Sequence, residues 1–316
     1  MNSTSRASAT PWTPDAIADQ RGRTALITGG NSGIGLETAR VLARHGARVI
    51  LAGRSRHKLD EAADGLRGAQ PDAEVATAVI DLGDLASLRR ATMALAETET
   101  IDLLFNNAGV MNIPERRTTS DGFELTFGTN HLGHFALTAG LMPALRRSPA
   151  ARIVTVSAIA ATWRMGRLED LMSDRRYGAM SAYAKSKRAN VVFTQELARR
   201  LDGTGVEALV VHPGSAMTNL QRHSQGALSK LVVALTSRTV MGSAEGAAWP
   251  SLYAATSPDA HSGQFIAPAG RDQTAGTPKA VPLPHGADDP AEGAFLWSES
   301  ERLTGIRFLS DPSVPR

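Results

Sequence analysis

The sequence of 316 residues predicts a single α/β domain around a mostly parallel, doubly wound sheet of seven strands, with helices on both faces. Three observations predict this fold class: short continuous apolar runs, segments of helical periodicity between them, and glycine-rich turns where several runs end. A strand without a polar face is typical of a parallel sheet, because such a strand is buried on both sides. A chain of this length can bury a sizeable core without disulfides or metal ions.

The expected strands are the apolar runs themselves. The first run, "TALITGG", ends in glycines, and the second, "ARVILAG", follows a helical segment that stops at Gly46. The same alternation continues along the chain. We expect strands at residues 24–30, 47–53, 74–82, 101–109, 152–158, 206–214 and 263–268.

The expected helices lie between these runs and carry apolar residues on one face. Phe193, Leu197 and Leu201, for example, are spaced four residues apart and fall on one side of a helix. We expect helices at residues 35–46, 56–67, 85–97, 121–146, 181–201 and 244–256.

Three segments fall outside this alternation. Residues 1–21 are polar and are expected to form a flexible arm, with the α/β domain at 22–270. Residues 215–240 are expected to be a loop with short helix. The segment 271–316 is rich in Gly, Pro and Asp and is expected to be an irregular extension.

Composition excludes several classes of function. The chain has no cysteine, so disulfides, thiolate catalysis and cysteine–zinc sites are ruled out. Its net charge is only +3 and its basic residues are scattered, which argues against a nucleic-acid partner. The amino-terminal stretch lacks the apolar core of a signal peptide, and no run reaches the roughly 20 apolar residues of a membrane helix. We expect a cytoplasmic protein without a membrane partner.

The stretch "TGGNSGIG", residues 28–35, follows the first strand and opens the first helix. Glycines there let the backbone approach a pyrophosphate, and a helix amino terminus offers unpaired N–H groups to it. The spacing is one residue longer than the common dinucleotide form, and a simple tight turn is the alternative. The expected cofactor-binding residues in this loop are Gly29, Asn31, Ser32, Gly33, Ile34 and Gly35.

The end of the second strand bears on the choice of cofactor. An acidic residue there would bind the ribose hydroxyls of NAD, but this chain has Gly53 followed by Arg54 and Ser55. A guanidinium and a hydroxyl suit the 2′-phosphate of NADP(H). The alternative is an exposed arginine that starts the next helix.

Tyr183 and Lys187 lie four residues apart in an expected helix and so share a face. An ammonium near a phenol stabilises the phenolate, which lowers the phenol pKa from about 10. Tyr183 could then exchange a proton with a substrate oxygen. Tyr177 lacks such a partner, because Ser181 stands four residues after it. A chance pair on a solvated helix is the alternative.

Further polar groups stand where strands end. Ser157 ends the fifth strand, and "NNAG" at 106–109 ends the fourth. "HPG" at 212–214 ends the sixth strand, while Asn130 lies in the long helix before the fifth. Ligands bind at the carboxyl edge of open parallel sheets, so these groups are expected to meet there.

Taken together, these motifs resemble those of the short-chain dehydrogenases/reductases over about residues 22–270. "DGFELTFGTNHLGHFALT", "ANVVFTQELARRL" and the long separation of Ser157 from Tyr183 resemble the retinol-dehydrogenase-like branch. The resemblance implies a Rossmann-type domain in which residues 215–240 form a small substrate lid. The matching pieces are "TGGNSGIG", Asp81–Leu82, "NNAG", Asn130, Ser157, "YAKSK" at 183–187, "HPG" and Thr218.

The resemblance also implies roles. Tyr183 would be the general acid in reduction and the base in oxidation, Lys187 would lower its pKa and bind the nicotinamide ribose, and Ser157 would hold the substrate carbonyl. Asn130 would support a water-borne proton relay through a bend in its helix. Further cofactor contacts are implied at Asp81, Leu82, Asn107, Ala108, Gly109, Pro213, Gly214 and Thr218.

We therefore expect an NADP(H)-dependent oxidoreductase that interconverts a ketone or aldehyde with an alcohol. A C=C reductase on the same residues is a second hypothesis. A non-catalytic nucleotide-binding scaffold is a third, and the intact Ser157, Tyr183 and Lys187 argue against it. The resemblance also allows a homodimer through the helices at 121–146 and 181–201, where Phe193 would be exposed.

Other residues are less informative. His131 and His134 lie three apart on one helix, but no third ligand has a telling spacing, so we expect surface or packing histidines and no metal site. Ile159 and Met217 are expected to line an apolar substrate pocket.

Overall fold

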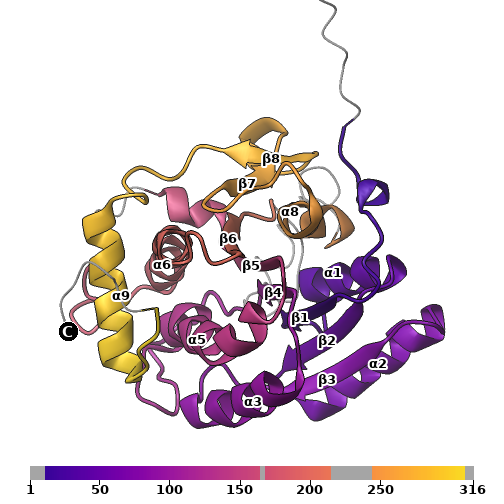
Figure 1. Ribbon diagram of the computed structural model, residues 1–316. Coiled ribbons are helices and arrows are strands. Elements are labelled where there is room, and N and C mark those ends of the chain that lie inside the picture. Colours follow the sequence, from indigo (N-terminus) through magenta and orange to yellow (C-terminus); the bar gives the residue numbers. More distant parts are fainter. Residues whose placement is uncertain (1–10, 164–167, 215–243, 310–316) are drawn as a thin grey trace, which may run out of the picture.

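The structure of the protein, a computed structural model, describes residues 11–163, 168–214 and 244–309. A single sheet has helices on both faces (Figure 1). Its eight strands lie in the order β3-β2-β1-β4-β5-β6-β7-β8, and only β7 and β8 pair antiparallel. The strands are β1 (Thr24–Thr28), β2 (Arg48–Gly53), β3 (Val75–Val79), β4 (Leu103–Asn106), β5 (Ala151–Val156), β6 (Val206–Val211), β7 (Phe265–Pro268) and β8 (Pro278–Val281).

The doubly wound α/β fold expected from the apolar runs is confirmed. Strand order reverses between β1 and β4, which lie side by side at the centre of the sheet. The chain leaves these two strands in opposite directions, so a crevice opens at their carboxyl ends. The glycine loop follows β1 and "NNAG" follows β4, and both therefore lie at this crevice.

Two layers of helices cover the sheet. One face is covered by α1 (Gly33–Arg44), α2 (Arg56–Ala69) and α8 (Ala244–Thr256), which contribute buried residues to one apolar cluster. The other face is covered by α3 (Leu85–Thr98), α5 (Gly133–Arg146) and α6 (Ala179–Arg200), which contribute to a second cluster. Burial of both sheet faces explains why the strands are apolar throughout.

The helix expected at 121–146 begins later and changes form along its length. Gly122 has a φ of +85°, a left-handed conformation that turns the chain before a helix can start. The helix begins as α4 (Leu125–Phe127), where the buried Glu124 carboxylate accepts hydrogen bonds from two backbone N–H groups. A π-helical segment, η2 (Gly128–Leu132), contains Asn130 and leads into α5. The expected bend at Asn130 is thus a π-helical segment.

The tail is not irregular, contrary to the expectation. β8 adds an antiparallel edge strand, and α9 (Pro290–Thr304) is a helix of 15 residues. The side chain of Asp289 accepts a hydrogen bond from the Ala291 N–H at the start of α9, and Gly305 ends it with a φ of +68°. These are common capping residues, but the Gly- and Pro-rich composition of the whole tail conceals them.

The amino-terminal arm is also more ordered than expected, in the part that the structure describes. Trp12 packs edge-on against Tyr253 of α8, with ring centroids 5.4 Å apart. Ile17 is buried in the same apolar cluster as α1. Residues 11–21 therefore lie against the domain.

Helix α9 packs against α6 (Figure 1). Trp297 of α9 stacks on Phe193 of α6, with ring centroids 5.8 Å apart, and Phe193 is only 2% exposed. A buried ion pair, Arg188 to Glu292 at 2.7 Å, joins the same two helices. The expectation of an exposed Phe193 is wrong, because α9 covers the face on which a partner subunit was expected.

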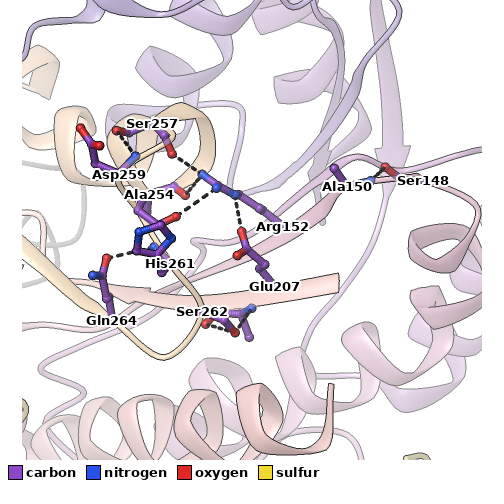
Figure 2. Close-up of polar contacts among 12 residues, drawn as sticks. Ser148, Ala150, Arg152, Glu207, Ala254, Ser257, Asp259, His261, Ser262 and Gln264 are labelled. Carbon is purple, nitrogen blue, oxygen red and sulfur yellow. Dashed lines mark hydrogen bonds and ion pairs between the residues drawn. The ribbon is translucent and has the colours of Figure 1, made fainter. Parts of the chain in front are cut away.

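The Arg152 guanidinium, near the start of β5, joins the sheet to the end of α8 (Figure 2). Arg152 donates from Nε to the Glu207 carboxylate at 2.7 Å. Its terminal nitrogens donate to the carbonyl oxygens of Ala254, Ser257 and Ala260, at and beyond the end of α8. The last carbonyls of a helix lack donors within the helix, so Arg152 stabilises the end of α8 and ties it to β5.

In the ranges that the structure describes, none of the helices is both long and apolar enough to cross a membrane.

The covered α6 face predicts a monomer. Light scattering on the full chain should give about the chain mass of 33.4 kDa at all concentrations tested, because Phe193 already has an intramolecular partner. Trp297→Ala serves as the comparison, since it uncovers Phe193 and should promote association. A wild-type mass near twice the chain mass would contradict the prediction.

Candidate functional site

Two adjoining cavities open at the carboxyl edge of the sheet. The first has a volume of about 470 Å³ and lies over β2 and β3, and the second, of about 360 Å³, lies over β5 and β6. They share five lining residues. The shared residues are Gly29, Ser32, Ala108, Gly109 and Met111.

The glycine loop needs glycine for conformation and for space. Gly29 and Gly33 have φ angles of +66° and +54°, in the left-handed region that other residues rarely adopt. A Cβ at Gly35 would lie 2.5 Å from the Gly29 carbonyl oxygen and 2.6 Å from Nδ2 of Asn107. The loop therefore packs closely on the turn after β4 and leaves the start of α1 facing the cavities. This arrangement fits the phosphates of a dinucleotide.

Most of the residues expected to bind a cofactor line the two cavities, whereas Gly33 and Gly35 support the loop from behind. Thr218 and Met217 lie outside the described residues, as does the expected lid at 215–240. The first cavity is lined by Gly29, Asn31, Ser32, Arg54, Ser55, Asp81, Leu82, Ala108 and Gly109, and the second by Gly29, Ser32, Ile34, Asn107, Ala108, Gly109, Tyr183, Lys187, Pro213 and Gly214.

Two cations border the first cavity. Arg54 stands at the end of β2, and Lys58 stands one helical turn further along, on α2. Sequence reasoning missed Lys58, which lies in the first turn of α2. Gly53, at the end of β2, places no carboxylate beside these two cations.

The turn after β4 is held from beneath by Thr28. Its hydroxyl accepts hydrogen bonds from the backbone N–H groups of Asn107 and Ala108, both at 2.9 Å. The Asn107 side chain donates to the Thr28 carbonyl oxygen at 2.7 Å. Thr28 therefore fixes the wall common to both cavities.

Tyr183, Lys187 and Ser157 line the second cavity together. Lys187 Nζ lies 5.8 Å from the centre of the Tyr183 ring and donates to the Val156 carbonyl oxygen at 2.9 Å. The Ser157 hydroxyl donates to the Lys187 carbonyl oxygen at 2.7 Å. The helix and the end of β5 are thus joined at the residues expected to be catalytic.

The pKa of Tyr183 is not lowered as expected. Burial raises it to about 12, because the phenolate would lie in an apolar environment. Burial also lowers the pKa of Lys187 to about 8. The ammonium is directed at the Val156 carbonyl rather than at the phenol, so the neighbouring positive charge does not offset the burial of the tyrosine. At neutral pH, Tyr183 is neutral and Lys187 is mostly charged.

Asn130 lies behind the cavities and is fully buried. Its side chain accepts from the Val110 N–H at 2.8 Å and donates to the Val110 carbonyl and to the Ser186 hydroxyl, both at 2.9 Å. Ser186 in turn donates to the Tyr183 carbonyl oxygen at 2.8 Å. The Asn130 amide thus joins the turn after β4 to α6, and it does not line either cavity.

The mouth of the second cavity is apolar. Ile159, Trp163 and Met180 are 39%, 46% and 40% exposed, although each is large and hydrophobic, and all three line this cavity. Sequence reasoning found Ile159 but missed Met180, which lies just before Tyr183 on α6. Exposed apolar groups that gather at a cavity mark a binding surface for an apolar group.

Two residues near Tyr183 point elsewhere. The Tyr177 hydroxyl donates to the Ile113 carbonyl oxygen at 2.6 Å. Lys185 donates to the Asp170 carbonyl oxygen and to the Ser173 hydroxyl.

Comparisons with known proteins agree with this geometry. A family model described as short chain dehydrogenase matches residues 23–228. Retinol dehydrogenase 13 of Homo sapiens is 40% identical over 298 residues, which cover 93% of this chain and 87% of that protein. Retinol dehydrogenase 12 of Mus musculus is 44% identical over 290 residues, which cover 91% of this chain and 88% of that protein.

Solved structures give the same result. A crystal structure of an uncharacterised protein from Mycobacterium paratuberculosis matches with a TM-score of 0.76 at 39% identity, over 95% of this chain and 99% of that one. The RhlG/NADP active-site complex of Pseudomonas aeruginosa matches with a TM-score of 0.63 at 27% identity, over 78% of this chain and 94% of that one.

Burial of the Lys187 ammonium predicts a cost in stability. Between pH values of about 8 and 10.5 the unfolded chain binds a proton at Lys187 that the folded protein does not, so folding stability rises with pH across this window. Lys187→Met removes the buried charge, while Val156 keeps the hydrogen bond from Asn190 at 3.1 Å. The variant should therefore unfold at a higher temperature than wild type at pH 7.

This advantage should shrink as the pH rises toward about 10.5, and thermal unfolding at both pH values measures it. Lys58→Met, which changes an exposed lysine, should leave the unfolding temperature unchanged. A Lys187→Met variant that unfolds earlier than wild type at pH 7 would be incompatible with the argument.

Proposed function

Because the chain belongs to the short-chain dehydrogenase family, we propose that it is an NADP(H)-dependent oxidoreductase that interconverts a ketone or aldehyde with an alcohol, with Tyr183 as its general acid and base. The observation that carries this proposal is that Tyr183, Ser157 and Lys187 line one cavity, which shares a wall with the glycine-loop cavity. A bound nicotinamide supplies or accepts the hydride in such a reaction.

Tyr183 is suited to give a proton to a carbonyl oxygen. With a pKa raised to about 12, the phenol keeps its proton at neutral pH and is ready to act as an acid. To stabilise the phenolate by charge as it forms, the Lys187 ammonium must turn from the Val156 carbonyl oxygen toward the phenol. The same pKa leaves little phenolate at neutral pH, so the group that would act as the base in alcohol oxidation is scarce there.

Ser157 is suited to orient the substrate oxygen. Its hydroxyl donates to the Lys187 carbonyl and keeps its lone pairs free for a donor such as the Tyr183 phenol or a substrate alcohol. The Ser157 hydroxyl can therefore accept a hydrogen bond from a substrate alcohol as it stands. To donate to a substrate carbonyl, it must first rotate away from Lys187.

The lining supports an uncharged, apolar substrate. Lys187 is the one mostly charged group at neutral pH among the described lining residues of the second cavity, since burial lowers the pKa of His212 to about 4. Ile159, Trp163 and Met180 offer apolar contact at the mouth. The names of the retinol dehydrogenase relatives agree with an apolar alcohol or aldehyde as the substrate class.

Arg54 and Lys58 support NADP(H) as the cofactor. Both side chains border the first cavity at the end of β2, where the 2′-phosphate of the cofactor would meet them. Gly53 leaves no carboxylate at this point to bind the ribose hydroxyls of NAD or to repel a phosphate. The charges at this end of β2 thus favour the phosphorylated cofactor.

Replacement of the acid tests the proposal directly. Tyr183→Phe should lower turnover of an apolar aldehyde with NADPH by about 10²-fold or more, because general acid catalysis is lost, while NADPH affinity changes little. Tyr177→Phe is the matched control, because this tyrosine lies outside the cavity and should leave turnover near that of wild type. Near-normal turnover in Tyr183→Phe would refute the role of Tyr183. Turnover of activated alkenes but of no carbonyl would favour a C=C reductase.

The cofactor preference has its own test. Wild type should favour NADPH over NADH by at least about tenfold in kcat/KM. Arg54→Ala should remove most of this preference, because it lowers kcat/KM for NADPH and leaves the value for NADH unchanged. Lys58→Ala should also lower the preference for NADPH, but by less than Arg54→Ala does. Arg56→Ala is the control, because Arg56 lies between the two cations but donates to Thr77 at 3.0 Å outside the cavity. An equal preference in wild type and Arg54→Ala would show that the cofactor is selected elsewhere.

A further inference from the structure

His134 is buried in α5 behind the site and lines neither cavity. Its ring lies between the glycine-loop strand and the π-helical segment. Nδ1 is 3.0 Å from the carbonyl oxygen of Asn130, and Nε2 is 3.0 Å from the hydroxyl oxygen of Thr28. Burial lowers the pKa of His134 to about 4, so the imidazole is neutral at pH 7.

The hydrogen bonds determine which nitrogen carries the proton. A carbonyl oxygen accepts hydrogen bonds only, so Nδ1 must carry the proton that it donates to Asn130. Nε2 is then an acceptor, and the Thr28 hydroxyl must donate to it. The neutral ring thus has one tautomer in this setting, and both of its nitrogens are satisfied.

The Thr28 hydroxyl has no spare capacity. Its oxygen accepts the N–H groups of Asn107 and Ala108, which uses both lone pairs. Its single proton can go to Nε2 of His134 or to the Phe105 carbonyl oxygen, each 3.0 Å away. Among the residues that the structure describes, no other group donates to His134 Nε2, so this nitrogen fixes the rotation of the Thr28 hydroxyl and with it the lone pairs that hold the turn.

We propose that His134 is a positioning residue, whose Nδ1-protonated ring orients the Thr28 hydroxyl and thereby holds the Asn107–Ala108 turn, the shared wall of both cavities, in register with Asn130. The consequence for cofactor affinity rests on the proposed function, whereas the hydrogen-bond arrangement does not. Through Asn130 and Ser186 the same chain of hydrogen bonds reaches the Tyr183 backbone. One imidazole therefore links the wall beside the glycine loop to the helix of the general acid.

Two near-conservative variants separate positioning from simple packing. In His134→Gln the side-chain oxygen reaches the place of Nε2 and can still accept from Thr28. In His134→Asn the amide nitrogen takes the place of Nδ1 and can donate to Asn130, but nothing reaches Thr28. A packing role predicts that the smaller asparagine and the longer glutamine lower stability without a selective effect on the turn.

The first measurement uses the free protein. Amide hydrogen exchange at Asn107 and Ala108 should be faster in His134→Asn than in wild type by about fivefold or more, as expected for one lost hydrogen bond, and nearly unchanged in His134→Gln. Nitrogen NMR of the wild-type ring should show Nδ1 protonated and Nε2 bare. Equal exchange in wild type and His134→Asn, or an Nε2-protonated ring, would overturn the proposal.

The second measurement is NADPH binding by fluorescence. The dissociation constant should rise about fivefold in His134→Asn and recover in His134→Gln. His131→Asn is the matched control: His131 is buried on the same helical stretch but bonds to Ser300 of α9 at 2.9 Å, so its loss should lower stability and leave NADPH affinity unchanged.

An equal loss of NADPH affinity in His131→Asn and His134→Asn would show that His134 is only a packing residue. If wild type bound no dinucleotide, the proposed function would fall, and the exchange measurement alone would decide the role of His134.

Discussion

The carbonyl group of Val156, the last residue of β5, organises the candidate site. It accepts hydrogen bonds from Lys187 Nζ and from the Asn190 side chain, both on α6. The next residue, Ser157, donates back to the Lys187 backbone. Because these bonds run in both directions between strand and helix, the lysine, the serine and Tyr183 keep one relative arrangement at the edge of the sheet. A shift of α6 along its axis would break all of them together.

Sequence patterns predicted the central sheet well and its margin poorly. The central strands are apolar on both faces because helices cover both, so their signal is strong. β8 has four residues, begins with Pro278 and is half exposed, which gives no apolar run to detect. α9 was missed for another reason: its caps, Asp289 and Gly305, are individually recognisable, but they lie in a segment whose overall composition resembles a loop.

The candidate site was likewise predicted only in part. Ser157, Tyr183, Lys187 and the glycine loop follow spacing rules, and sequence alone locates them at the carboxyl edge. The pKa of Tyr183 could not be predicted, because it depends on how deeply the phenol is buried and on where the Lys187 ammonium points. His134 was taken for a packing or surface residue, since its two partners, Thr28 and Asn130, are distant from each other in sequence and come together only in the fold.

The docking of α9 on α6 has a consequence for behaviour on dilution. A helix supplied by a second chain leaves when the protein concentration falls below the dissociation constant, and it takes its contacts with it. Here Trp297 and Glu292 belong to the same polypeptide as Phe193 and Arg188, so the local concentration of the covering helix is set by the connecting chain. Support for the helix of Tyr183 is therefore the same in a nanomolar assay as in a crowded cell.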